Sequence, residues 1–380
     1  MNRARRQHCQ PYSATRELSW GQKVGRLFGF GRSVSVLRLS ETSMEELIAR
    51  HQTSGCPVGY GRVGTVYKVR TRILEPLVST SYRTTPYPVS GERLPKFVAL
   101  KKATARKKEE SEEALTDLRN EWDMLSNLYH PNIVTVHGFI ENFQGAFLAM
   151  PFYHCCLSDL VEDNIRLSSV KYSTKDMLFI SRDIARGLKY LVVDNGILHC
   201  DLFHKNILVT SDNTAVIADF GKARTSASCV ARINFEKYHE GIVAPELYIR
   251  ETSFTPQSES FAFGHVLLCI LVGQSKVPIW QIKEEAFQSL LSFFTTENLA
   301  LNNSVLKNNP QPEAVEKLLE VTSSCLKLSP AHRAGPDCWV SGVEDAIREF
   351  RYEVDQSEDV KPDVNMSDES GRTGSWCVIS

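Results

Sequence analysis

The stretch His199-Cys200-Asp201-Leu202-Phe203-His204-Lys205-Asn206 carries the most informative pattern in the chain, H-x-D-L-x-x-x-N. Its acid can orient a hydroxyl group and accept the proton, and its amide is a hard oxygen donor suited to a divalent cation. Phosphoryl transfer needs such groups, because it depends on positioning and charge neutralisation more than on covalent chemistry. Asp201 and Asn206 are therefore the first candidate site residues.

Four further motifs accompany this stretch in order along the chain. They are G-x-G-x-x-G-x-V at residues 59–66, V-A-x-K at residues 98–101, Asp219-Phe220-Gly221 and Ala244-Pro245-Glu246. A loop of glycines lets the backbone close over phosphates, although taken alone it also suits a glycine-bearing hairpin. A dinucleotide-binding unit would need a helix after these glycines, where residues 65–69 instead read as a strand.

Together the five motifs resemble the signature of eukaryotic protein kinases over about residues 55–350. The resemblance implies an α+β, bilobed fold. A small β-rich N-lobe would cover about residues 55–150, with an insertion at about 75–96, and a larger, mostly helical C-lobe about 151–350. It also implies ATP and Mg²⁺ as cofactors and a protein as the substrate.

The resemblance assigns a role to each matching residue. Asp201 would orient the substrate hydroxyl, with Lys205 nearby in the same stretch, residues 199–206, which is called the catalytic loop. Asn206 and Asp219 would hold Mg²⁺. Lys101 would hold the nucleotide and Glu121 would hold Lys101. The remaining cofactor-binding residues would line the phosphates, the adenine and the hinge: Gly59, Gly61, Gly64, Val66, Ala99, Met150, Pro151, Phe152 and Tyr153.

Three positions depart from the family pattern. Cys200 stands where an arginine usually grips an activation-loop phosphate, so we expect activity without such phosphorylation. Glu259 replaces the usual aspartate near the start of the apolar C-lobe helix, and we expect it to support the catalytic loop more loosely. Phe203 stands where Ser/Thr kinases usually carry a lysine two residues after the catalytic aspartate.

The phosphorylated hydroxyl is not settled by these residues. Lys205 leans toward the tyrosine kinases, which have an arginine there, yet the segment before Ala244 lacks their usual tryptophan and also the threonine of Ser/Thr enzymes. Ser/Thr specificity is favoured because such enzymes are more numerous. The alternatives are a tyrosine or dual-specificity kinase, a pseudokinase-like membrane scaffold, and a small-molecule kinase of related fold.

Composition limits the function classes further. The 380 residues are 42% hydrophobic with a net charge of −1, which excludes disorder and offers no general field for nucleic acid. The apolar run 261–273 is too short to span a membrane, so we expect a buried helix. No apolar run of signal-peptide length follows Met1, so we expect a cytoplasmic protein. We also expect a monomer. Ser173-x-x-Asp176 predicts the capped start of a helix.

The two ends of the chain differ from the middle. Residues 1–54 read as a basic arm followed by a short lead-in helix, and residues 351–380 as an acidic, disordered tail. The tail ends Cys377-Val378-Ile379-Ser380, a C-a-a-X sequence of the farnesylated type. We therefore expect a prenyl anchor on Cys377 at the cytoplasmic face of a membrane; the alternative is an incidental cysteine in a frayed end.

Overall fold

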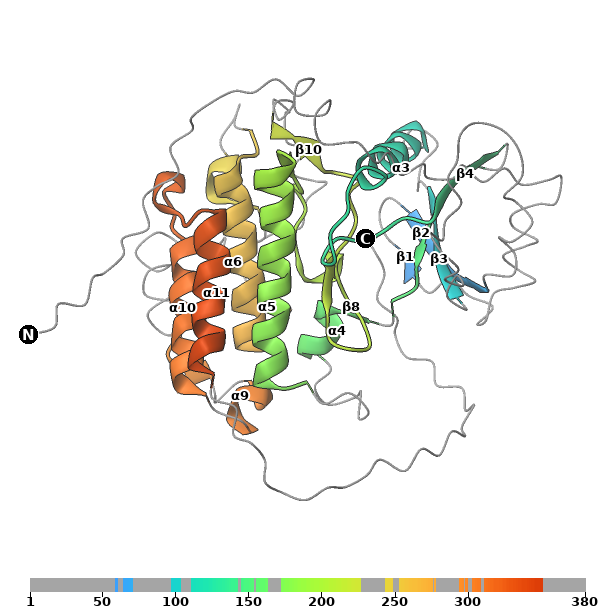
Figure 1. Ribbon diagram of the computed structural model, residues 1–380. Helices are drawn as coiled ribbons and strands as arrows, with labels where there is room; N and C mark the ends of the chain where they lie inside the picture. Colours follow the sequence, from blue (N-terminus) through green and yellow to red (C-terminus); the bar gives the residue numbers. More distant parts are fainter. Residues whose placement is uncertain are drawn as a thin grey trace, which may run out of the picture.

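The protein is described by a computed structural model. The residues it describes are 59–60, 64–70, 97–103, 111–142, 145–153, 155–162, 172–226, 243–248, 253–275, 277, 294–296, 298–299, 303–308 and 311–350. A β-sheet with one helix lies at one end, and a group of long helices lies at the other (Figure 1). This is the expected bilobed α+β arrangement, and the fold class is confirmed.

The N-lobe is a five-stranded antiparallel sheet with strand order β1-β2-β3-β5-β4. Its strands are β1 (Gly59–Tyr60), β2 (Gly64–Arg70), β3 (Phe97–Ala103), β4 (Gly138–Asn142) and β5 (Gly145–Pro151). The α3 helix (Ser111–Leu125) contacts β3 and β5. The helix packs against the sheet because its buried residues recur at spacings of three and four, at Ala114, Leu118, Glu121 and Leu125.

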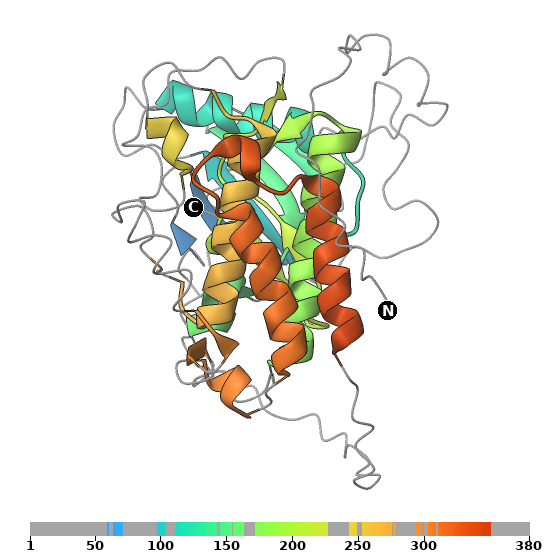
Figure 2. The ribbon, with the colours of Figure 1, turned by 90° about the vertical axis from the view of Figure 1, so that its left-hand side faces the viewer.

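The C-lobe is built on four long helices. They are α5 (Thr174–Lys189), α6 (Pro256–Val272), α10 (Pro312–Cys325) and α11 (Pro336–Glu349), with the shorter α4 (Leu157–Glu162) and α9 (Ser304–Asn308) beside them. The four long helices stand side by side, with α11 against both α5 and α10, as two views at right angles show (Figures 1 and 2). These helices contribute many side chains to the large apolar core, which continues through the catalytic-loop strands into the N-lobe.

The α6 helix is buried on every side along most of its length. Its residues 258–271 are all buried, and it ends at Gly273, whose φ of 72° suits a glycine. The approach of α10 is close: a Cβ on Gly264 would lie 2.7 Å from Cys325 Cβ. The expected buried helix in the apolar run is therefore confirmed. Among the described residues, no helix combines the length and apolarity that crossing a membrane requires.

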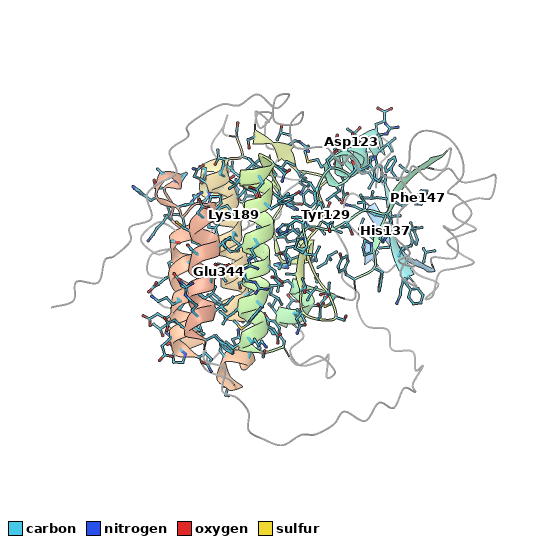
Figure 3. The ribbon with its side chains drawn as sticks, in the orientation of Figure 1. Asp123, Tyr129, His137, Phe147, Lys189 and Glu344 are labelled. Carbon is cyan, nitrogen blue, oxygen red and sulfur yellow. The ribbon has the colours of Figure 1, made fainter. Side chains whose placement is uncertain are left out.

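The α5 helix begins as the sequence predicted. Ser173 is its N-cap, and a capping box with Asp176 satisfies two backbone N–H groups. The same helix carries Arg186 and Lys189, which form ion pairs of 2.8 Å with Glu344 and Asp337 of α11, respectively. Figure 3 labels one residue of each pair, Lys189 and Glu344. These pairs are solvent-exposed and contribute little to stability, so apolar packing holds α5 and α11 together.

Two small sheets and a short turn set up the catalytic loop. The strands β6 (Cys155–Cys156), β8 (Ile207–Val209) and β9 (Ala215–Ile217) form one sheet, and β7 (Ile197–Leu198) pairs with β10 (Arg224–Thr225). The H-x-D stretch therefore lies between β7 and β8. The Asp219 motif follows β9 directly, so adjacent strand ends bring the two motifs to one place.

Candidate active site

A buried ion pair joins the sheet to the α3 helix. Lys101 lies in β3 opposite Val66 of β2 and Leu148 of β5, on the face of the sheet that α3 covers. Glu121 occupies a position in the buried stripe of α3 that is otherwise apolar. Lys101 Nζ lies 2.7 Å from Glu121 Oε2, and both side chains are almost fully buried. The register of β3 and the stripe of α3 thus bring these two predicted residues together.

Asp219 completes this cluster from the C-lobe side. Its Oδ1 lies 2.8 Å from Lys101 Nζ, and the backbone N–H of Phe220 donates to Glu121 Oε1 over 3.3 Å. Asp219 has a φ of 63°, a left-handed conformation that costs a non-glycine residue about 1 kcal/mol or more. The cluster therefore holds Asp219 in a strained backbone conformation, as is common at functional sites.

The charges in the cluster do not balance, because two carboxylates surround one ammonium. Burial by itself would lower the pKa of Lys101, but the attraction of Asp219 and Glu121 outweighs it and raises that pKa. Burial raises the pKa of Glu121 to about 6, since the attraction of Lys101 only partly offsets the loss of solvation and Asp219 adds repulsion. A site with a net negative charge is suited to bind a cation.

His199 ties the catalytic loop to the Asp219 segment. Its Nε2 lies 3.0 Å from the carbonyl oxygen of Ala218, and its Nδ1 accepts the N–H of Asp201 over 3.3 Å. The ring contacts Phe220 edge-on, with centroids 4.9 Å apart. Burial lowers the pKa of His199, so the neutral ring with a proton on Nε2 satisfies both contacts.

Asp201 and Asn206 are linked through the backbone of the same loop. Asn206 Nδ2 donates to the carbonyl oxygen of Asp201 over 2.9 Å, and the N–H of Ala218 donates to the carbonyl oxygen of Asn206 over 2.8 Å. The carboxylate of Asp201 lies 2.7 Å, through Oδ2, from Lys222 Nζ. Lys222 was not among the predicted residues, since three residues after Asp219 it looks in the sequence like any surface lysine.

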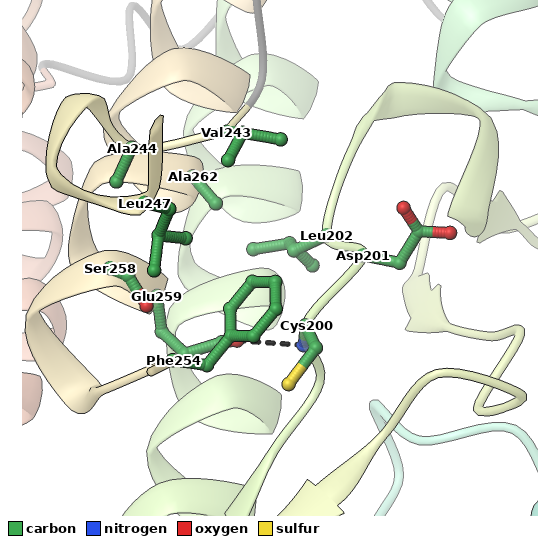
Figure 4. Close-up of a pocket in the computed structure, with 10 residues that line it drawn as sticks. All are labelled: Cys200, Asp201, Leu202, Val243, Ala244, Leu247, Phe254, Ser258, Glu259 and Ala262. Atoms are coloured by element: carbon green, nitrogen blue, oxygen red, sulfur yellow. Dashed lines mark hydrogen bonds between the residues drawn. The ribbon is translucent and has the colours of Figure 1, made fainter. Parts of the chain in front are cut away.

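Glu259 of α6 supports the catalytic loop from behind. Its Oε1 accepts the N–H of Cys200 over 2.7 Å (Figure 4). Cys200 has a φ of 62°, so this bond holds a second strained residue directly before Asp201. Glutamate at this position therefore reaches the loop, and the expectation that it supports the loop more loosely than aspartate stays a prediction. The Cys200 side chain is buried, with Sγ 3.5 Å from the carbonyl oxygen of Leu198.

A small pocket lies beside Asp201, between the catalytic loop, the residues around Ala244 and the start of α6. Its lining is mainly apolar and consists of Cys200, Asp201, Leu202, Val243, Ala244, Leu247, Phe254, Ser258, Glu259 and Ala262. The carboxylate of Asp201 points away from these apolar side chains (Figure 4). A segment seated here would therefore lie next to the carboxylate without covering it.

The described candidates for nucleotide binding lie on β1, β2, β3 and β5 and on the residues that follow β5. Ala99 of β3 pairs with Met150 of β5, and both are buried, as is Val66 of β2. Pro151, Phe152 and Tyr153 lead out of β5 toward the C-lobe, and burial raises the pKa of Tyr153 to about 12. Gly59 begins β1, where it pairs with Val66, and Gly64 begins β2. The roles of these residues stay predictions.

Four predictions fall outside the described residues: Gly61, the insertion at about 75–96, the two terminal segments, and Cys377. Lys205, by contrast, is described. It lies in the short 3₁₀ turn His204–Asn206, where its side chain is exposed and makes no hydrogen bond or ion pair with another described residue. The structure brings Lys101, Glu121, Asp201, Asn206 and Asp219 into one site, and it does not bring Lys205 to the Asp201 carboxylate.

The donor atoms present suit a divalent metal that is shared with a bound phosphate. Asn206 and the Asp219 carboxylate offer hard oxygen ligands of the kind Mg²⁺ prefers. Within the described part of the chain, no group of three or more His, Cys, Asp and Glu side chains is arranged to hold a metal by itself. Two protein ligands therefore leave most of an octahedral shell for phosphate oxygens and water.

A second ion pair lies in the C-lobe, remote from the cluster. Arg333, which is fully buried, donates to Glu246 Oε1 over 2.6 Å and to Oε2 over 2.7 Å. It also donates to the carbonyl oxygens of Gln257, Lys327 and Leu328. This arginine thereby fixes the Ala244-Pro245-Glu246 turn, which lines the pocket, to the helical part of the C-lobe.

Comparison with known proteins agrees with this geometry. Calmodulin-binding receptor-like cytoplasmic kinase 1 of Arabidopsis thaliana is 27% identical over 69% of this chain and 56% of the relative. Calmodulin-binding receptor-like cytoplasmic kinase 2 of the same plant is 25% identical over 73% of this chain and 64% of its own length. The probable serine/threonine-protein kinase PBL28, also from Arabidopsis thaliana, is 28% identical over 62% of this chain and 63% of its own length.

The chain thus spans less than two thirds of the length of each of these relatives. The protein kinase domain family matches residues 89–342, which is more than half of the chain. The matched segment contains Lys101, Glu121, Asp201, Asn206 and Asp219. Members of this family use ATP and a divalent metal to phosphorylate proteins. The chain belongs to the protein kinase family.

Proposed function

We propose that the chain is an active kinase that transfers the γ-phosphate of Mg²⁺-ATP to Ser and Thr hydroxyls of proteins. The observation that carries the proposal is the contact of Lys101 with both Glu121 and Asp219. Protein kinases need the lysine–glutamate pair and the metal-binding aspartate in place at the same time. A chain that serves only as a scaffold has no chemical need for this charged, buried arrangement, since burying it costs free energy.

Each residue has one role in the proposed transfer. Asp201 accepts the proton of the substrate hydroxyl as the hydroxyl oxygen bonds to the γ-phosphorus and the bond from phosphorus to the ADP oxygen breaks. Lys101, held by Glu121, pairs with the α- and β-phosphates. Asn206 and Asp219 would hold Mg²⁺, which when bound neutralises charge between the phosphates.

The preference for Ser and Thr rests on the relatives. One of them is named a probable serine/threonine-protein kinase, and the resemblance supports the same specificity here. Phe203 and Lys205 leave the tyrosine alternative open in the sequence. The phosphorylated amino acid therefore has to be measured.

The test is phosphate transfer by the full chain from Mg²⁺-ATP to a mixture of Ser-, Thr- and Tyr-containing peptides, followed by phosphoamino-acid analysis. Asp201→Asn should lower transfer by about a thousandfold or more, because the base is lost. Asp123→Asn makes the same chemical change at an exposed site on α3 and should leave transfer unchanged. Phosphotyrosine as the only product would refute the specificity. Nucleotide binding without transfer would favour the scaffold alternative.

We further propose the predicted domain limits, with a kinase domain at 55–350 between the segments 1–54 and 351–380, and a prenyl anchor on Cys377. The anchor requires Ser380 to be the natural C-terminus, which mass spectrometry of the native protein can establish. Membrane partitioning should then be lost in Cys377→Ser, because the lipid is the hydrophobic element of the anchor. Partitioning that survives this substitution would refute the anchor.

A further inference from the structure

Lys222 forms an ion pair with the carboxylate of Asp201, the proposed catalytic base. Its Nζ lies 2.7 Å from Asp201 Oδ2, and the two side chains are only 14% and 7% exposed. A charge-assisted bond at this distance in a mostly buried place fixes the orientation of a carboxylate strongly. The contact joins residues 21 positions apart, so the fold creates it.

The backbone around Lys222 is firmly held. The N–H of Ala223 donates to the carbonyl oxygen of Phe220 over 3.0 Å, which closes a turn that contains Gly221 and Lys222. Arg224 then donates to the carbonyl oxygens of Gly221 and Ala223, and its strand β10 pairs with β7. The turn therefore presents the Lys222 side chain to Asp201 from a fixed position.

The catalytic loop itself does not provide this charge. Phe203, two residues after Asp201, is a buried apolar side chain that contacts the His204 ring edge-on. Lys205, four residues after Asp201, is exposed. Among the described residues, the cation that bonds to the Asp201 carboxylate is that of Lys222.

We propose that Lys222 is a positioning residue for phosphoryl transfer, one that holds the Asp201 carboxylate toward the substrate hydroxyl. In this chain the turn after Asp219 supplies the positive charge that neither Phe203 nor Lys205 brings to the base. The inference rests on the proposed kinase activity, and it adds a residue that acts on the reaction through Asp201.

The test compares four variants of the full chain in steady-state transfer from Mg²⁺-ATP to peptide. Lys222→Met should lower kcat by about 10- to 100-fold, because a misplaced base costs this much, and should leave KM for ATP within about threefold. Lys222→Gln should show a similar loss of kcat. If Lys222→Met does not fold, Lys222→Gln serves in its place. Lys222→Arg, which keeps the charge, should recover most of kcat. Lys307→Met removes an exposed lysine of α9, outside the catalytic loop, and should stay within about twofold of wild type.

A double variant separates a positioning role from direct contact with phosphate. In the Asp201→Asn background, Lys222→Met should cause no further loss beyond about twofold, because the residue through which it acts is already disabled. Losses that multiply would overturn the proposal, and so would full kcat in Lys222→Met and Lys222→Gln. If wild-type protein transfers phosphate while these variants keep its kcat, the Lys222 role alone is wrong. If wild-type protein transfers none, the proposed function and the Lys222 role are both wrong.

Discussion

The bond from Glu259 to the N–H of Cys200 makes a quantitative prediction, because aspartate is the residue usual in the family. Glu259→Asp shortens the side chain by one carbon–carbon bond, about 1.5 Å. The acceptor would move from 2.7 Å to roughly 4 Å from the Cys200 nitrogen, beyond hydrogen-bond range. The side chain is 2% exposed, so water does not readily replace the lost partner.

The size of the effect follows from this bond. A hydrogen bond to a charged group contributes about 1.5–3 kcal/mol, so Glu259→Asp should lower the free energy of unfolding by about 2 kcal/mol. For a domain of this size that is a fall in Tm of about 4–8 °C. Glu259→Gln keeps both the side-chain length and an acceptor oxygen, so it should lower the free energy of unfolding by about half as much as Glu259→Asp. Because Cys200 directly precedes Asp201, kcat should fall in the aspartate variant while KM for ATP changes little.

The assay is equilibrium denaturation of the full chain, with transfer kinetics on the same preparations. Glu313, exposed in the first turn of α10, supplies the matched control. Glu313→Asp and Glu313→Gln alter an acid near a helix N-terminus without a contact to the catalytic loop, and each should change stability by less than about 1 kcal/mol. The reasoning is refuted if Glu259→Asp is as stable as Glu313→Asp, or if Glu259→Gln loses more than Glu259→Asp.

Three further outcomes are expected. Arg333→Met should lower the free energy of unfolding by about 3–5 kcal/mol, since it leaves Glu246 without its partner, and a thermal scan within 3 °C (about 1 kcal/mol) of wild type would contradict this. Burial raises the pKa of Glu121 from 4.5 to about 6, so the folded protein binds this proton more tightly than the unfolded chain and stability should fall as pH rises from about 4.5 to about 6. Transfer should fall below about pH 6, where protonated Glu121 no longer pairs fully with Lys101; denaturation curves of wild type and Glu121→Gln with parallel pH dependence would refute the assignment. Because Cys200 cannot grip a phosphate, phosphatase treatment should leave kcat within about twofold, and loss of all activity would show that another group does so.

Much of the fold could be predicted because local signals agree with the tertiary arrangement. The Ser173–Asp176 spacing gave the start of α5, and the apolar run gave a buried helix whose every face is covered. Five ordered motifs then implied the bilobed fold and the Lys101–Glu121 pair. A charged residue in a buried position needs an oppositely charged partner, so the residue types at these positions indicate the pairing.

The rest could not be predicted, because it depends on where tight turns place side chains. Lys222 is one lysine among many in the sequence, and only the turn closed by Phe220 and Ala223 directs it to Asp201. Lys205 is nearer to Asp201 in sequence but projects into solvent from a 3₁₀ turn. The contact of Glu259 with Cys200 likewise had to come from the structure, since residue type alone does not give the distance between α6 and the loop.

One short segment connects the two halves of the site. Asp219 gives a carboxylate to Lys101 of the N-lobe, and Lys222, three residues later, gives an ammonium to Asp201 of the C-lobe. Ala218, directly before them, bonds to both His199 and Asn206. A displacement of residues 218–222 by even one hydrogen-bond length would therefore break the nucleotide-side pair and release the base together. The ion pair at Lys101 and the orientation of Asp201 are coupled through this turn, so a change that frees Asp219 should also lower kcat through Asp201.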